Sequence, residues 1–468
     1  MSEQPLIIIG AGPAGLTAAH EAVRQGMSPL VLERTGRVGG LARTELYRGY
    51  SFDIGGHRFF TKIPKIQHLW EEMIGDDFLK VPRKSSISYR GHFFNYPPDF
   101  FDVFSKLGIV ECALIALSYL KSQIRPHSHP VTFEEWVSNH FGYRFYRTFF
   151  QKYTEKVWGI PCNRLRADWA AQRIRGLSLA SVVSKIFFGG NNAKSMIGEF
   201  SYPRRGAGEM WDRFQEAVTA GGGRVEFNAE VIRVKVEGGK ITGLTTRGEG
   251  EPIEHPVGSL ISSIPVNLLV GILDVDVPDN VRQAARKLSY RSHMTVGLII
   301  DREDLFPDQW IYVHDPDVRV ARIQNYKNWS ADMVPDPGTS GIGMEYFANV
   351  GDELWNMSDA DMIDLASRDL AALKLAGDND VADGFVIRQA EAYPVYDFGY
   401  EENVAAVRDY LKTIENLQTI GRNGLYRYNN MDHSMYTGLL AMQNLLGAHH
   451  DLWDVNEERE YLEEYSDT

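Results

Sequence analysis

The sequence predicts an α/β fold, in which a Rossmann-like nucleotide-binding domain carries a helical insertion and an antiparallel β-sheet domain for the substrate. Three observations lead to this prediction. A short apolar strand at 6–9 breaks into a glycine-rich turn and then into a helix. Helical patterns fill most of residues 99–190. Alternating patterns that are typical of antiparallel strands recur between residues 294 and 347.

The turn after the first strand has the spacing of a phosphate-binding loop. Gly10 permits a tight turn, Gly12 lets the backbone approach a pyrophosphate, and Gly15 lets the helix pack closely on the strand. A second apolar run at 29–32 ends at Glu33, where a ribose 2′-hydroxyl needs an acceptor. This order predicts dinucleotide binding without separating FAD from NAD(P). The expected contacts are Gly10, Gly12, Pro13, Ala14, Gly15 and Glu33.

A basic, glycine-rich loop follows Glu33 over residues 34–43. Its N–H and guanidinium groups can serve a second phosphate or a ribityl chain, as in flavoproteins that resemble the glutathione reductase and amine oxidase families. A solvated loop without a ligand is the alternative. The cofactor contacts expected here are Arg34, Gly39, Gly40, Leu41 and Arg43.

Composition excludes several classes of function. The chain of 468 residues is long enough for two or three domains, and its net charge of −13 argues against nucleic acid as the main partner. Cys112 and Cys162 are the only cysteines, and no Cys or His spacing suggests a metal site. We expect a cytoplasmic protein without a signal peptide. The apolar helix at 109–120 contains Glu111 and is too short for a membrane span, although a peripheral membrane role stays open.

The order of the predicted elements divides the chain into discontinuous parts. Buried strands at 260–265 and 417–420 are expected to return to the parallel sheet, and a helix at 433–446 follows the second of them. The predicted parts are an FAD-binding domain (1–60, 200–285 and 415–450), a helical domain (98–199), a sheet domain for substrate (61–97 and 286–414) and an acidic tail (451–468).

Four segments resemble the flavin-dependent UDP-galactopyranose mutase family. They are a Gly-Gly-His segment at 55–60, a Tyr-Thr-x-Lys-x-Trp-Gly segment within 150–159, a helix that begins at 169–173, and a Gly-Arg-x-Gly segment that opens 421–432. The resemblance implies an amine-oxidase-like FAD fold of the glutathione reductase 2 type. It also implies that reduced flavin (FADH2) attacks the anomeric carbon of a nucleotide sugar and interconverts its pyranose and furanose forms. NAD(P)H is a candidate reductant.

The resemblance also assigns residues to the site. It implies that Tyr153 lies near the nucleotide and Trp158 near the sugar, and that Tyr400 and Tyr428 resemble phosphate-binding tyrosines. His57 and Arg173 are the predicted catalytic residues. Further flavin contacts are expected from Gly56, His57, Arg422, Tyr428, Met431 and Asp432. The predicted substrate contacts are Tyr153, Trp158, Arg173, Arg322, Tyr400, Tyr428 and Asn430.

These assignments have structural alternatives. They are a turn-capping role for His57, a surface ion pair for Arg422, a helix cap at Asp432 and core packing for the aromatic side chains. Arg204 and Arg205 follow a proline and either add to flavin or phosphate binding or form a charged surface loop.

The sequence departs from the family at one position that matters for function. The family carries a diphosphate-binding arginine on a central strand, whereas the corresponding segment at 295–301 has none. Arg302 follows that strand, and Arg322 lies on the next strand but one. An FAD-dependent oxidoreductase of the amine or protoporphyrinogen oxidase type is therefore the alternative, and a non-catalytic flavin-binding module is a third. Because no protein nucleophile stands out, the chemistry is expected to belong to the cofactor.

Overall fold

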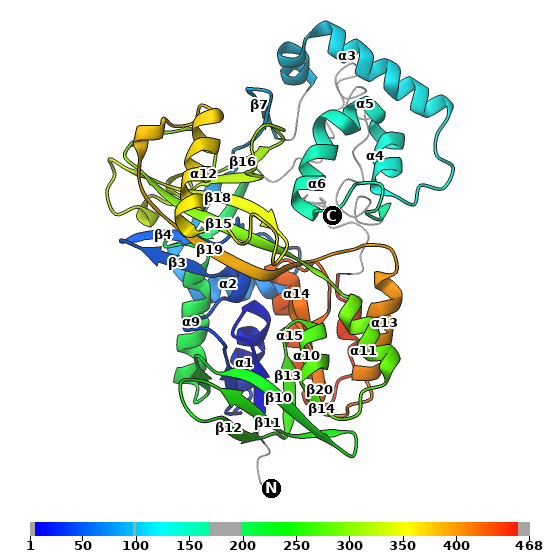
Figure 1. Ribbon diagram of the computed structural model, residues 1–468. Helices are drawn as coiled ribbons and strands as arrows, with labels where there is room; N and C mark the ends of the chain where they lie inside the picture. Colours follow the sequence, from blue (N-terminus) through cyan, green and yellow to red (C-terminus); the bar gives the residue numbers. More distant parts are fainter. Residues whose placement is uncertain (1–4, 97–99, 168–197, 457–468) are drawn as a thin grey trace.

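The computed structural model describes residues 5–96, 100–167 and 198–456. Figure 1 shows a parallel sheet with its helices in the lower half, a large mixed sheet at the upper left and a group of helices at the upper right. These three parts surround the candidate site, so each is described by what it contributes there.

Five parallel strands form the lower half, in the order β20-β13-β1-β2-β9. The central strand β1 (Leu6–Ile9) is buried along its whole length, which explains its unbroken apolar sequence. The helix α1 (Pro13–Arg24) follows β1 and packs against both α9 (Gly208–Ala220) and α15 (Met431–Leu445). The other strands are β2 (Leu30–Leu32), β9 (Arg224–Glu226), β13 (Ser259–Ser262) and β20 (Leu417–Thr419).

Smaller elements complete this half. A four-stranded sheet in the order β12-β11-β10-β14 shares its hydrophobic core with β1 through Val234, Ile241 and Leu244. Its strands are β10 (Glu230–Glu237), β11 (Lys240–Arg247), β12 (Ile253–Pro256) and β14 (Leu273–Asp274). The remaining elements are β3 (Thr44–Tyr47), β4 (Tyr50–Asp53), α2 (Pro64–Ile74), β5 (Phe78–Pro82), β8 (Glu199–Pro203), α10 (Val266–Ile272), α11 (Asp279–Lys287), α13 (Tyr400–Leu411) and α14 (Gly421–Gly424).

Seven strands form the large sheet, in the order β19-β15-β18-β17-β16-β6-β7. The helix α12 (Asp359–Ala372) covers one face, where it packs on β15 and β19 (Figure 1). Every neighbouring pair is antiparallel except β16 and β6, which run parallel. The strands are β6 (Ser85–Tyr89), β7 (His92–Asn95), β15 (Tyr290–Ile300), β16 (Trp310–Val313), β17 (Arg322–Asn325), β18 (Ser340–Ala348) and β19 (Val381–Pro394).

The helical part begins with α3 (Phe100–Ile124), which is interrupted at Gly108, where φ is +80°. Next comes α4 (Phe133–Phe141), whose N-terminus is closed by a capping box between Thr132 and Glu135. It is followed by α5 (Tyr143–Tyr146), a π-helical turn (Arg147–Gln151) and α6 (Lys152–Trp158). A core of aromatic side chains, among them Phe133 and Trp158, holds these helices together.

The predicted fold class is confirmed, because the parallel sheet, the helical insertion and the predominantly antiparallel sheet are all present. The predicted division into domains stays a prediction. Two details differ from expectation. The large sheet is mixed rather than wholly antiparallel, because β6 joins it beside β16. The strand β15 begins at Tyr290 rather than near 294, so it includes Arg291.

Candidate functional site

A cavity of about 830 Å³ lies where the three parts of the molecule meet. Its lining comes from the loop before α1, from α6 of the helical part, from β15, β16, β17 and β19 of the large sheet, and from α14 and the segment that follows it. Most of the predicted contacts face it: Gly10, Gly12, Pro13, Ala14, Glu33, Arg34, Gly40, Leu41, Arg43, Gly56, His57, Tyr153, Trp158, Arg322, Arg422, Tyr428, Asn430, Met431 and Asp432.

The glycine-rich loop has the geometry that its sequence predicts. A Cβ atom at Gly15 would lie 1.9 Å from the carbonyl oxygen of Gly10, so only glycine lets α1 pack here. A Cβ at Gly12 would meet nothing nearer than the Cα of Gly40, at 3.8 Å. The space above Gly12 is therefore open toward the cavity, at the positive end of the α1 dipole, and it suits an anion.

Glu33 is buried at the end of β2 and organises this loop. Its Oε2 accepts a hydrogen bond from the backbone N–H of Ala11 at 2.9 Å, and its Oε1 accepts one from the N–H of Thr35, also at 2.9 Å. The carboxylate therefore fixes both loops that border the cavity. Ribose recognition by Glu33 stays a prediction.

The basic loop after Glu33 closes this end of the cavity. Arg43 donates to the carbonyl oxygen of Gly40 at 3.0 Å, which holds the loop in place. Arg34 reaches across to Glu391 on β19, with 3.5 Å between Nη2 and Oε2. Gly39 lies beside Trp211 and does not line the cavity. The loop is thus fixed to both sheets.

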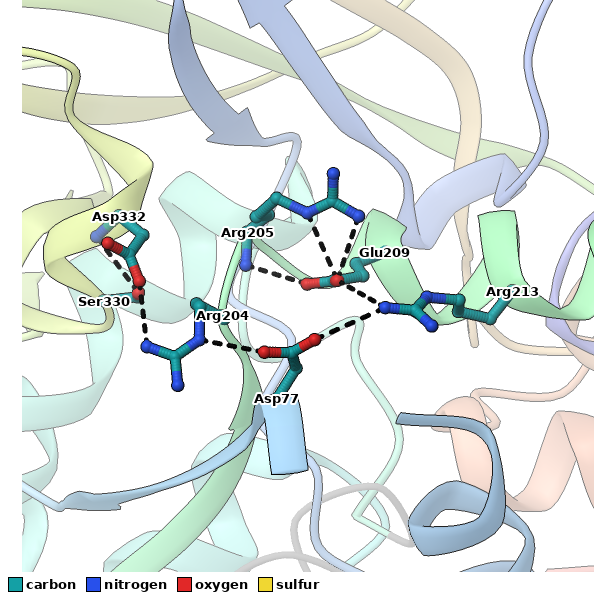
Figure 2. Close-up of polar contacts among 7 residues, drawn as sticks. All are labelled: Asp77, Arg204, Arg205, Glu209, Arg213, Ser330 and Asp332. Carbon is teal, nitrogen blue, oxygen red and sulfur yellow. Dashed lines mark hydrogen bonds and ion pairs between the residues drawn. The ribbon is translucent and has the colours of Figure 1, made fainter. Parts of the chain in front are cut away.

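Arg204 and Arg205 do not face the cavity. Arg204 forms ion pairs with Asp77 and Asp332, each at 3.0 Å, and Arg205 pairs with Glu209 at 3.1 Å. Figure 2 shows these side chains turned toward one another in one charged network. Of the two alternatives for these arginines, the geometry favours the structural one.

Gly56 and His57 lie beneath the large sheet. A Cβ at Gly56 would lie 1.6 Å from the ring of Trp310, so the indole occupies the space of any side chain there. Thr295 on β15 donates a hydrogen bond to the carbonyl oxygen of Ile54 at 2.6 Å and holds the segment against the sheet. Burial, together with the nearby positive charge of Arg422, lowers the pKa of His57 to about 4. The imidazole is therefore neutral at pH 7.

The lowered pKa of His57 predicts a pH dependence of stability. Below pH 6.5 the unfolded chain binds a proton at this residue that the folded chain rejects, so stability falls with pH until about pH 4. Between pH 7 and pH 5 this effect amounts to about 2 kcal/mol. We expect the thermal midpoint of His57→Gln to fall less over this interval than that of the wild type. His68→Gln, on the exposed face of α2, is the control and should follow the wild type; an equal fall in all three proteins would contradict the prediction.

An aromatic cluster forms the wall opposite the glycine-rich loop. The guanidinium of Arg422 lies 4.7 Å from the ring centre of Tyr428 and 5.3 Å from that of Tyr393. Trp158 packs against both tyrosines from α6. Arg422 also donates to the carbonyl oxygen of Asn429 at 2.9 Å, so it lies half-buried among aromatic rings rather than in a surface ion pair.

Arg322 of β17 contributes a positive charge to the cavity wall. It forms an ion pair with Glu345 on the neighbouring strand β18 and donates to Tyr393 Oη at 3.1 Å. The imidazole Nε2 of His293 contacts the same carboxylate at 3.0 Å. The positive charge of Arg322 and the hydrogen bond from His293 outweigh burial and hold the pKa of Glu345 down at about 2. Among the described residues, Arg322 Nε has no hydrogen-bond partner.

Sequence reasoning missed Lys156, which anchors α6. Its ammonium group donates to the carbonyl oxygens of Val313, Asp315, Val318 and Val320 at 2.9–3.3 Å. Burial lowers the pKa of this amine to about 8. Lys156 thereby holds the helix that carries Tyr153 and Trp158 against the connection between β16 and β17. No local pattern signals this role, because the four acceptors are main-chain atoms.

Gly15, Gly39 and Tyr400 of the predicted site do not line the cavity. Tyr400 begins α13, stacks on Tyr396 with 4.6 Å between ring centres, and does not line the cavity. Arg173 lies outside the described residues. Arg291, which the longer β15 contains, donates to the carbonyl oxygens of Val157 and Phe347 at 3.2 and 2.9 Å and faces away from the cavity.

Comparisons with known proteins agree with this architecture. The family model for flavin containing amine oxidoreductases matches residues 13–438. A crystal structure of reduced UDP-galactopyranose mutase superposes with a TM-score of 0.85 at 22% identity, over 97% of this chain and 98% of the other. A protein from Exiguobacterium sp. 255-15, provisionally described as a protoporphyrinogen oxidase, superposes with a TM-score of 0.72 at 17% identity, over 95% and 99% of the two chains.

Sequence relatives match only short stretches. Lysine-specific histone demethylase 1 homolog 3 of Arabidopsis thaliana is 56% identical over 45 residues, which is 10% of this chain and 3% of that protein. The structural likenesses lie below 25% identity and therefore show the fold alone. They confirm that this fold resembles that of UDP-galactopyranose mutase.

Proposed function

Because the chain belongs to the flavin-containing amine oxidoreductase family, we propose that it binds FAD in this cavity and interconverts the pyranose and furanose forms of a nucleotide-diphosphate sugar. The observation that carries this proposal is the position of Arg322. A buried guanidinium on the cavity wall, among tyrosine side chains, suits a diphosphate whose base and sugar need aromatic surfaces.

The residues present fit FAD along the length of the cavity. Gly12 and the start of α1 would hold the pyrophosphate, and Glu33 would accept a hydrogen bond from the ribose. At the other end, α15 begins at Met431 after its N-cap Asn430, and the positive end of its dipole would stabilise negative charge on the flavin. When bound in its reduced form, the flavin supplies the nucleophile.

The protein then has to orient the substrate and neutralise its leaving group. Arg322 would bind the diphosphate, with Tyr428 beside it as a hydroxyl donor and Tyr153 as a platform for the base. We assign Arg173 to the same diphosphate on the strength of the family resemblance. Trp158 would cover the sugar, and a neutral His57 would lie beside the flavin without adding a second positive charge. Such contacts act through orientation and electrostatic stabilisation.

Activity assays on the reduced and the oxidised protein should decide between the mutase and the oxidoreductase. We expect dithionite-reduced protein to isomerise at least one sugar from a panel of UDP-, GDP- and dTDP-sugars, and the oxidised protein to isomerise none. Chromatography of the sugar products measures the result. Formation of hydrogen peroxide by the oxidised protein, with no isomer from the reduced protein, would overturn the mutase assignment.

One observation favours the oxidoreductase as the second candidate. An arm of the cavity runs into the helical part between apolar rings, which are those of Phe133, Phe141, Phe145, Phe149 and Phe150. A nucleotide sugar has no group for such an arm, whereas an apolar substrate that donates a hydride does. NAD(P)H stays a candidate reductant in either case.

A further inference from the structure

The helix α3 turns an apolar face away from the molecule. Among the described residues it is the one helix that is long and apolar enough, by length and composition, to cross a membrane. Beyond the break at Gly108, the exposed fractions are 70% for Ile109, 62% for Leu117 and 78% for Ile124. Other exposed side chains of the same stretch are Val110, Leu114 and Leu120. Helical spacing of three to four residues places them on one face.

The opposite face of α3 is fixed to the protein by polar contacts and by the buried side chain of Ile115. Glu111 forms an ion pair with Arg144 at 2.7 Å, and Ser118 Oγ accepts a hydrogen bond from the backbone N–H of Arg144 at 3.0 Å. A surface helix of a monomeric protein ordinarily does the reverse, burying its apolar face. An exposed apolar face of this extent marks an interaction surface.

The charge of the helical part indicates which kind of partner binds the apolar face of α3. Residues 100–167 contain nine Lys and Arg against five Asp and Glu, in a chain whose net charge is −13. At the C-terminal end of α3 a second cavity, of about 250 Å³, is lined by Lys121, Arg125 and His127 together with hydroxyl and amide side chains. In the part of the chain that the structure describes, neither Lys121 nor Arg125 forms an ion pair. A phosphate group fits such a lining.

We propose that α3 docks on the surface of an anionic phospholipid bilayer. The face that contains Leu117 enters the boundary between headgroups and acyl chains, and the cavity at Lys121 and Arg125 takes a lipid phosphate. The helix lies on the membrane and does not cross it. The break at Gly108 interrupts the helix, and residues 109–124 beyond it extend only about 24 Å, less than the hydrocarbon core of about 30 Å. Glu111 also stays paired with Arg144.

This orientation has a consequence for the large cavity. Val103 belongs to the first part of α3 and also lines that cavity. Docking of α3 would therefore bring the apolar arm of the large cavity near the lipid. The docking proposal does not depend on which reaction the flavin site performs.

Cosedimentation of the purified protein with vesicles tests the proposal. We expect binding to phosphatidylcholine vesicles that contain about 30% phosphatidylglycerol to exceed binding to pure phosphatidylcholine about tenfold. Leu117→Glu should lower this binding about tenfold or more. Val350→Glu is the matched control, because Val350 is also 62% exposed but lies outside α3, and it should bind like the wild type. Thermal melting would show that both variants fold.

Two further results separate the parts of the proposal. Lys121→Ala together with Arg125→Ala should remove the preference for anionic vesicles, while free glycerol phosphate should not compete with them. Absence of binding to any vesicle, or unchanged binding of Leu117→Glu, would overturn the proposal. So would light scattering that finds a dimer for the wild type and a monomer for Leu117→Glu, because α3 would then be a contact between copies.

Discussion

Arg322→Met should weaken the binding of UDP to the protein at least about 100-fold, which corresponds to about 2.7 kcal/mol. The guanidinium lines the cavity and, among the described residues, keeps its Nε without a hydrogen-bond partner. Loss of two charge-assisted hydrogen bonds to a diphosphate accounts for a change of this size. Isothermal titration with UDP measures it. Arg302→Met removes an exposed arginine that pairs with Asp380 and should change the affinity less than about twofold.

A second variant separates binding from folding. Arg322→Met alone leaves the buried Glu345 carboxylate with His293 and Gln324 but without its arginine, and removal of one partner of a buried ion pair costs about 3–5 kcal/mol of stability. Arg322→Met combined with Glu345→Gln should regain most of this stability but none of the affinity. If the double variant binds UDP as tightly as the wild type, Arg322 has no role in the substrate site.

Gly15→Ala should give a protein that retains almost no flavin. The new methyl group would overlap the carbonyl oxygen of Gly10, so α1 must move away from β1 at a cost of about 1–3 kcal/mol. Gly12→Ala should behave differently. Its methyl group has room in the folded chain, so stability without flavin should match the wild type while FAD affinity falls at least about tenfold.

Visible absorbance after gel filtration measures the retained flavin in both variants. Gly271→Ala is the matched control, because a Cβ there meets nothing within 4 Å, and it should retain flavin fully. Normal FAD binding by Gly12→Ala would show that the pyrophosphate does not lie over this loop.

The nucleotide-binding end could be predicted from sequence because its determinants are local. The turn, helix and acidic residue that shape it fall between Gly10 and Glu33, so their spacing alone implies their arrangement. The predicted contacts of this loop line the cavity, apart from Gly15 and Gly39, whose glycine character serves packing against Gly10 and Trp211.

The part of the cavity that Arg322 and Gly56 line could not be predicted from local sequence patterns. The position of the Arg322 guanidinium depends on its ion pair with Glu345 of the adjacent strand. The need for glycine at position 56 depends on the indole of Trp310, 254 positions further along the chain. No pattern within one segment contains such pairs. Apolar periodicity does not reveal the start of β15, because Arg291, next to its first residue, is buried through hydrogen bonds to carbonyl oxygens rather than through apolar packing.

The hydrogen bonds of Lys156 couple the movement of α6 to that of the large sheet. Four main-chain oxygens surround its ammonium group, and they belong to the connection between β16 and β17. The helix α6 and the connection between β16 and β17 must therefore shift together. A ligand that pushes Tyr153 outward would displace Trp310 on β16 with it, and so would move the indole that fills the space beside Gly56.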